Sequence, residues 1–280
     1  EYRCVLTVEG VREAVAEALK AAADDRWIAF DTETTGLNAH AGDRVIEFAA
    51  VELCLDENGA MVGTKSHDML FNPGIPIPRE VVKLTGITDE DVADAPPFKK
   101  RAKEVHALLE GRLCIAHNLP FDRGFLSNEF QKVGLKWPLA LAEIDTFDMS
   151  VRFFSGTRGH KLGDLSQRLG VTLDGAHRAT NDAEASGRSF LELCDRMNAP
   201  TGLQEMLDWA HALGQPPESP WIGPEDGALV FLDGEYQGEA IEKHPTHLHW
   251  MLMALERRED RWHPRYPEPL KIWIQRFLEL

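Results

Sequence analysis

Short runs of apolar residues near the start of the chain are typical of β-strands. The pattern predicts a buried strand over 27–32, a second strand over 45–59 that ends in an Asn-Gly turn, and a third strand over 62–71. These three runs follow one another with turn-forming residues between them. We therefore expect them to pair as an antiparallel meander.

Apolar residues three and four positions apart predict several helices along the first 198 residues. These helices are expected at residues 11–25, 102–109, 121–133, 162–169 and 183–197. Two more short strands, at 113–116 and 144–146, fall between them. Strands followed by alternating strands and helices indicate an α/β domain with a mixed sheet, which we place at residues 1–198.

The composition changes beyond this domain. A helix is predicted at 200–213 and a linker rich in proline and glycine at 214–227, so residues 199–227 would connect the domain to a small module at 228–280. Five of the seven tryptophans lie beyond the α/β domain, and a small unit needs such large side chains to bury enough surface. Within the module, residues 246–257 are predicted to be helical.

The chain of 280 residues is acidic, with a formal net charge of −16. This charge disfavours passive binding to nucleic acid, but it permits an enzyme whose phosphate contacts run through metal ions. Because no apolar run approaches the ~20 residues of a membrane helix, no contact with a membrane is expected. The four cysteines lack CxxC spacing and are expected to be reduced, which favours a cytoplasmic protein.

The segment IAFDTETTGL (28–37) places two carboxylates two residues apart at the end of an apolar run. Side chains alternate between the faces of a strand, so Asp31 and Glu33 are expected on the same face. At ~7 Å they would repel by about 2 kcal/mol at an effective dielectric constant of ~20. A solvated strand end would tolerate this repulsion, whereas a bound cation would offset it.

Two later segments each add a carboxylate beside a predicted helix start. AHNLPFDRGFL contains Asp122, and HRATNDAEA contains His177 and Asp182. Each acid alone is typical of a helix cap or of a partner for the helix dipole. None of the three acidic segments is therefore specific when it is taken by itself.

Together, the four carboxylates and the histidine match the needs of phosphoryl chemistry with two metal ions. Mg²⁺ and Mn²⁺ prefer oxygen ligands, and a pair of ions can stabilise both the attacking and the leaving oxygen. The histidine would supply a general base. A zinc site would need more histidine or cysteine ligands than this set offers.

The segments FDTETTGL, AHNLPFD and HRATNDAEA resemble, in order and spacing, the three exonuclease motifs of the DnaQ-like superfamily. A histidine five residues before the last aspartate, as His177 stands before Asp182, is the pattern of its DEDDh branch. RVIEFAAVEL, LTGIT and GHKLGDLSQRLGV fit as well, so the resemblance covers about residues 26–197. It implies a ribonuclease H-like fold and the removal of nucleotides from 3′ ends.

The resemblance also implies a role for each residue of the motifs. Asp31 would bridge two metal ions, Glu33 and Asp182 would hold the first, and Asp122 would hold or orient the second. His177 would take a proton from the attacking water, and hydrolysis would release a nucleoside 5′-monophosphate. The residues expected around the terminal nucleotide are Thr34, Gly36, Leu37, Thr85 and Asn118.

Residues 228–252 resemble the small C-terminal module of exonuclease X-like proteins. The residues retained from that pattern are Phe231, Gly234, Gly238, Pro245, Leu248 and Trp250. Asp233 and Glu235 stand where the lysines of the pattern would fall, so the sequence departs from it there. We expect this accessory module to contact the substrate or a partner protein.

The preferred hypothesis is a 3′–5′ exonuclease that acts on the 3′ end of single-stranded nucleic acid, with DNA favoured over RNA, in proofreading or repair. One alternative is an exoribonuclease that trims RNA or short oligonucleotides. Two others are a catalytically silent nucleic-acid-binding module and a carboxylate-rich metalloprotein without nuclease activity.

Overall fold

The computed structural model describes residues 27–55, 61–154, 157–199, 219–225, 228–258, 261–266, 270, 271, 274 and 278. The helices predicted over 11–25 and 200–213 and the predicted Asn-Gly turn lie outside these residues. Among the helices of the described part, none is long and apolar enough to span a bilayer.

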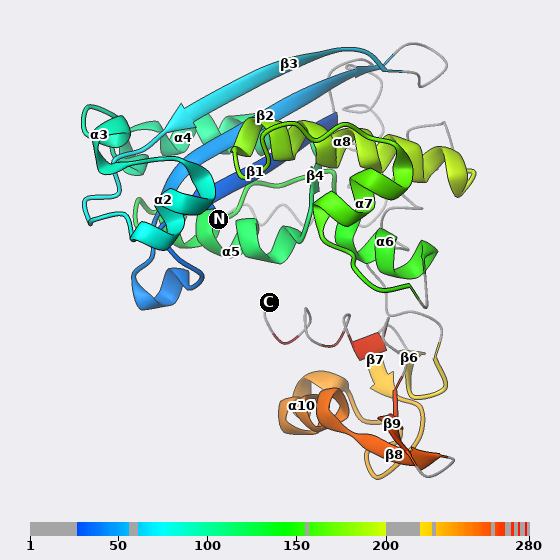
Figure 1. The fold of residues 1–280 in the computed structure, drawn as a ribbon. Coiled ribbons are helices and arrows are strands. Elements are labelled where there is room, and N and C mark those ends of the chain that lie inside the picture. Colours follow the sequence, from blue (N-terminus) through cyan, green and yellow to red (C-terminus); the bar gives the residue numbers. More distant parts are fainter. Residues whose placement is uncertain are drawn as a thin grey trace, which may run out of the picture.

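Five strands form one mixed sheet in the order β3-β2-β1-β4-β5 (Figure 1). They are β1 (Trp27–Thr34), β2 (Val45–Leu55), β3 (Met61–Leu70), β4 (Leu113–Ala116) and β5 (Ala142–Asp145). The first three pair antiparallel, which confirms the predicted meander, whereas β4 pairs parallel to β1 and β5 parallel to β4. Parallel neighbours require crossover connections, and helices supply them here. The predicted α/β class with a mixed sheet is confirmed.

Helices cover both faces of this sheet (Figure 1). The helices of this domain are η1 (Ala39–Ala41), α2 (Arg79–Thr85), α3 (Asp89–Val92), α4 (Phe98–Leu109), α5 (Leu119–Gln131), α6 (Thr146–Phe153), α7 (Leu162–Leu169) and α8 (Ala179–Arg196). On one face Phe30 packs with Phe98 of α4 and Phe130 of α5. On the other face Ala29 packs with Phe190 of α8, because neighbouring residues of a strand point to opposite sides.

Helix α8 approaches the sheet closely at Gly187. A Cβ atom at this position would lie 2.9 Å from Leu53 Cδ2 and 3.0 Å from Ala29 Cβ, so a larger residue would push the helix away from β1 and β2. Asp182 lies five residues earlier in the same helix. The glycine therefore helps to set the distance between the start of α8 and the central strand.

A second, smaller core lies in the C-terminal part. Its elements are β6 (Ile222–Glu225), β7 (Ala228–Phe231), η2 (Ile241–Lys243), α10 (Pro245–Met253), β8 (Leu255–Arg258) and β9 (Arg261–Pro264). Ile222, Phe231, Leu248 and Tyr266 are buried together in this core. The two hairpins, β6-β7 and β8-β9, form separate two-stranded sheets.

Three element predictions need correction. The linker predicted over 214–227 contains β6, because pairing with β7 overrides the weak strand propensity of its glycine and proline. The helix predicted over 246–257 forms as α10 but ends at Met253, because the residues from Leu255 onward form β8 and pair with β9. Helix α2 was not predicted, since the prolines before it suggested a loop, yet it begins directly after Pro78.

Candidate active site

Strand β1 carries Asp31 and Glu33 towards its carboxyl end. Both side chains lie on one face of the strand because they are two residues apart. Glu33 is only 8 % exposed, and the pairing of β1 with β2 shifts register between Glu33 and Thr34. Since β1 lies between β2 and β4, residues from both of its flanks can reach these two carboxylates.

Asp122 reaches the end of β1 from the first turn of α5. Asn118 is the N-cap residue of this helix and has a left-handed backbone (φ 69°). The Asp145 carboxylate accepts hydrogen bonds from the N–H groups of Asn118 and Leu119, both at 3.0 Å. The buried Asp122 carboxylate in turn accepts hydrogen bonds from Thr32 N (2.8 Å) and Thr32 Oγ1 (2.7 Å). Asp122 is thus bound to β1 through both donors of Thr32.

Asp182 and His177 come from the start of α8. The carboxylate of Asp182 accepts a hydrogen bond from the N–H of His177 at 2.9 Å, while the His177 side chain is exposed and its backbone is left-handed (φ 67°). One ligand atom each from Glu33, His177 and Asp182 lie within 4.8 Å of one another. The first and third motifs therefore meet in space.

The gathered carboxylates raise one another's pKa. Burial raises the pKa of Asp31 well above its usual range, and the charges of Asp122 and Asp182 raise it further. Burial and the charge of Asp182 raise the pKa of Glu33 to about 8. Burial also raises the pKa of Asp122 to about 7 and the pKa of Asp182 above its ordinary value. These shifts measure the cost of collecting negative charge in a site with little solvent.

The donors of this cluster fit divalent metal ions. Carboxylate oxygens are the ligands that hard cations prefer, and a bound cation would favour the ionised form of carboxyl groups whose pKa values are raised by burial and by one another. Asp31, Glu33, Asp122 and Asp182 would hold such ions. His177, the only nitrogen ligand of the local group of three, is consistent with oxygen-preferring metals.

A cavity of about 480 Å³ opens beside Glu33. Of the residues predicted to contact a nucleotide, those that line it are Thr34, Gly36, Leu37 and Thr85. Asn118 is not among the described residues of its wall. Pro78, Glu80, Val81, Leu84 and Phe121 line it as well, and most of these were missed because α2 was not predicted. Leu37 is 87 % exposed at the cavity, so the wall offers apolar surface together with polar groups.

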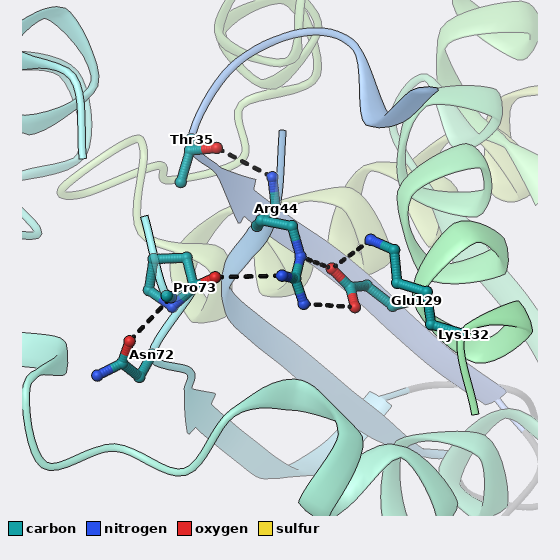
Figure 2. A network of polar contacts seen from close by, with 7 residues as sticks. Thr35, Arg44, Asn72, Pro73, Glu129 and Lys132 are labelled. Carbon is teal, nitrogen blue, oxygen red and sulfur yellow. Dashed lines mark hydrogen bonds and ion pairs between the residues drawn. The ribbon is translucent and has the colours of Figure 1, made fainter. Parts of the chain in front are cut away.

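Arg44 braces the loop that forms one side of this cavity (Figure 2). Its backbone N–H donates to Thr35 Oγ1 at 2.9 Å. Its guanidinium donates to both carboxylate oxygens of the buried Glu129 on α5 and to the carbonyl oxygen of Pro73 at 3.2 Å. The loop after β1 is thereby joined to α5 and to the segment after β3.

Two charged residues beside the carboxylates were not singled out from the sequence. Glu47 lies fully buried in β2. Arg178 directly follows His177 in the sequence, and its guanidinium donates a hydrogen bond to the Glu47 carboxylate. A charged residue inside the apolar run VIEFAAV was the available signal for Glu47. Its partner could not be found that way, because 131 residues separate them.

This strand order, with helices on both faces and carboxylates from β1, α5 and α8 gathered at one site, defines a ribonuclease H-like α/β fold. Residues 28–190 match the family model RNase_T, described as exonuclease. The chain belongs to this exonuclease family, in its DnaQ-like DEDDh group of 3′–5′ exonucleases. Membership of this group implies dependence on divalent metal.

Curated relatives agree with this assignment. The chain is 38 % identical over 172 residues to the 3′–5′ exonuclease DinG of Bacillus subtilis, an alignment that covers 61 % of this chain and 18 % of the relative. It is 36 % identical over 175 residues to a DNA polymerase III subunit epsilon-like protein of Rhodobacter capsulatus, covering 62 % and 24 % of the two chains. The chain thus spans at most about a quarter of the length of these relatives.

Solved structures share the fold. Exonuclease I of E. coli in complex with a dA16 oligonucleotide superposes with a TM-score of 0.53 at 19 % identity, covering 66 % of this chain and 42 % of the other. The nuclease domain of 3′hExo, a DEDDh family member bound to rAMP, gives 0.53 at 22 % identity, covering 62 % and 94 %. The family match ends at residue 190, so the resemblance of 228–252 to the exonuclease X-like module stays a prediction.

Proposed function

We propose that this chain hydrolyses the terminal phosphodiester at the 3′ end of single-stranded DNA and releases nucleoside 5′-monophosphates. The observation that carries this proposal is the meeting of Glu33, His177 and Asp182 within 4.8 Å of one another, beside a cavity of about 480 Å³. Asp31 and Asp122 add two more carboxylates to the same group. Reacting groups and a nucleotide-sized hollow thus adjoin.

Two divalent cations, Mg²⁺ or Mn²⁺, are proposed at the carboxylates. Asp31 would be shared between them, Glu33 and Asp182 would hold one, and Asp122 would hold or orient the other. When bound, such ions would stabilise negative charge on the attacking and leaving oxygens. The hydrogen bonds from Thr32 hold one oxygen of Asp122 in place.

His177 is proposed as the general base. Its ring is exposed to incoming water, while its backbone is held by Asp182. A histidine at this position could take a proton from the attacking water. The cavity would receive the terminal nucleotide, with Leu37 and Leu84 against its apolar face and Thr34 and Thr85 nearby.

DNA is proposed as the substrate, in proofreading or repair. Relatives named as DNA polymerase III proteins support this, as does Exonuclease I with its bound oligonucleotide. RNA remains the second candidate, because the 3′hExo nuclease domain with the same fold is bound to rAMP. The C-terminal module is proposed to contact the substrate or a partner protein. Trp250 is 47 % exposed in this module, so truncation of its side chain would test that contact.

The test is digestion of end-labelled single-stranded DNA, recessed duplex and RNA side by side, with Mg²⁺ or Mn²⁺. We expect stepwise loss from the 3′ end of single-stranded DNA at the highest rate, and near-complete loss of activity in Asp31→Ala and His177→Ala. Faster digestion of RNA would move the assignment to the second candidate. Absence of product from the wild type with either metal would reject the enzyme reading.

A further inference from the structure

Glu47 is an unusual residue for the centre of a sheet. It is fully buried in β2 and lies directly opposite Glu33 in the register of β1 and β2. Side chains of directly opposed residues project to the same side of a sheet, where like charges are unfavourable. The charge of Glu47 accordingly contributes to the raised pKa of Glu33. A residue that only filled space at this position would not carry a charge.

The carboxylate of Glu47 binds the start of α8. It accepts hydrogen bonds from Arg178 Nε at 3.1 Å, from Arg178 Nη2 at 2.7 Å and from the backbone N–H of Ala179 at 2.9 Å. Arg178 is the N-cap residue of the helix and makes no side-chain cap bond of its own. The helix start is thus bound to the sheet by a charged group rather than by a cap.

These hydrogen bonds lie close in the sequence to two residues of the site, His177 and Asp182. His177 immediately precedes Arg178, and its N–H donates to Asp182 in the first turn of α8. Since His177 has a left-handed backbone that non-glycine residues rarely adopt, its conformation needs support from its surroundings. Glu47 supplies this support on one side and Asp182 on the other.

We propose that Glu47 and Arg178 are positioning residues for the exonuclease reaction. Together they hold His177 and Asp182 against Glu33, although neither needs to touch the reacting phosphate. The inference rests on the roles proposed above for His177 and Asp182. It assigns to the buried charge of Glu47 a purpose that stability alone does not require.

The chain offers a matched control on the same strand. Glu52 is also buried in β2 and also bonds an arginine, with Arg112 Nη1 at 3.2 Å. Its partners lie outside the site, because Lys65 and His67 are on β3 and Arg112 directly precedes β4. Replacement of either buried glutamate by glutamine leaves its arginine with a neutral partner. A merely structural role predicts the same outcome for both.

The first experiment compares Glu47→Gln with Glu52→Gln in the full chain. The amide NH₂ of glutamine cannot accept a hydrogen bond, so at least one donor of Arg178 or Ala179 loses its partner. We expect kcat to fall about 30-fold in Glu47→Gln with KM within twofold, and to stay within twofold in Glu52→Gln, while both lower the urea midpoint. A loss of kcat no larger in Glu47→Gln than in Glu52→Gln would overturn the proposal.

Hydrogen–deuterium exchange of the metal-free chain gives a readout that is independent of activity. Peptides covering 176–182 should exchange at least fivefold faster in Glu47→Gln and unchanged in Glu52→Gln, because the His177 and Ala179 amides are held by this network. Unchanged exchange in Glu47→Gln would contradict the inference. The measurement needs neither metal nor substrate.

Arg178→Lys tests the same contact in case Glu47→Gln folds poorly. The Arg178 side chain is half-exposed, so this change should disturb the fold less. Lysine keeps the charge but lacks the paired donors. We expect kcat to fall about tenfold at constant KM; a raised KM at unchanged kcat would instead make Arg178 a substrate contact and overturn the assignment. Full activity in Asp31→Ala would reject the proposed site itself, whereas an inactive Asp31→Ala with a fully active Arg178→Lys rejects the positioning role alone.

Discussion

Two groups of buried carboxylates on neighbouring strands of one sheet have opposite electrostatic surroundings. Burial alone would raise the pKa of Glu52 in β2, but hydrogen bonds from His67, Lys65 and Arg112 outweigh burial and lower it to about 2. At the other end of the sheet, Glu33 in β1 has a pKa raised to about 8 by burial and by neighbouring acids. The two glutamates are comparably buried, so burial does not explain the difference.

The difference lies in where the cations come from. The chain supplies two cationic partners, Lys65 and Arg112, and a hydrogen-bonded His67 to Glu52, so this carboxylate is satisfied by the protein itself. Near Glu33 the charge of Arg178 lowers the pKa, but burial and the other carboxylates outweigh it. Glu52 is thus neutralised by side chains of the protein, whereas the group of four carboxylates that includes Glu33 lacks such compensation and is suited to bind cations from solution.

Asp31→Asn should have the largest effect and tests whether the carboxylates beside Glu33 differ from Glu52 as described. We expect hydrolysis of single-stranded DNA to fall at least ~10³-fold, equivalent to about 4 kcal/mol in the activation free energy, because Asp31 would lose an oxygen that is proposed to hold metal. The metal-free chain should at the same time become more resistant to urea, since the buried charge repelled by Asp122 and Asp182 is removed. Steady-state rates and urea unfolding in EDTA measure both effects.

Glu52→Gln is the opposite case and serves as the control. It should leave the rate within twofold while lowering the free energy of unfolding by roughly 3 kcal/mol, because a buried charge network loses its acceptor. If Asp31→Asn instead destabilised the metal-free chain as Glu52→Gln does, the carboxylates of the site would be satisfied by the protein and the comparison would fail.

The pH dependence of stability should also separate the two groups. The folded-state pKa of Glu33 lies near 8 against a reference of 4.5, so its contribution is fully present below pH 4.5 and is lost as the pH rises towards 8. We expect the free energy of unfolding of the metal-free chain to fall by on the order of 2–4 kcal/mol between pH 5 and 8.5. Urea titrations in EDTA measure this slope.

Glu33→Gln should make this slope shallower, with a remainder from Asp122, whose pKa is also raised, to about 7, whereas Glu52→Gln should not affect it. The pKa of Glu52 is depressed to about 2, so its stabilisation is present above pH 4.5 and is lost only as the pH falls towards 2. A slope that persists unchanged in Glu33→Gln would show that other groups cause it.

The sequence was sufficient for the central sheet, and it singled out acidic residues that the fold brings close together. The apolar runs of β1 to β4 have the length and spacing of buried strands, and α7 spans 162–169 as predicted. Asp31, Glu33, Asp122 and Asp182 could be selected because hard cations restrict the choice of ligand type. Such chemistry can be read from residue types and order, even before the fold brings the residues together.

Features that depend on distant partners were beyond the sequence pattern. Strand β6 contains a proline and a glycine and exists because it pairs with β7. Helix α2 follows several prolines, so its contribution to the cavity wall could not be foreseen. The contact of Glu47 with Arg178 joins residues 131 positions apart, and nothing in their local surroundings identifies them as partners.

Thr32→Val tests whether the hydrogen bond from the Thr32 hydroxyl to Asp122 is needed for activity. The change removes the Oγ1 donor to Asp122 and leaves the backbone donor in place. We expect kcat to fall about tenfold, because one charge-assisted hydrogen bond of roughly 1.5–3 kcal/mol is lost. Thr32→Ser keeps the hydroxyl and should retain most of the rate. Equal losses in both variants would point to packing rather than to the bond with Asp122.

Leu37→Ala should have the smallest effect, and it asks whether the cavity beside Glu33 receives the nucleotide. Leu37 is 87 % exposed, so its truncation should not change the free energy of unfolding. Loss of its contact with a bound nucleotide should cost about 1 kcal/mol, which raises KM roughly fivefold at constant kcat. Leu139→Ala, at a leucine that is 79 % exposed and outside the cavity wall, should leave KM unchanged. Equal KM values for the two variants would remove the cavity from the substrate path and leave the carboxylates as the sole grip on the 3′ end.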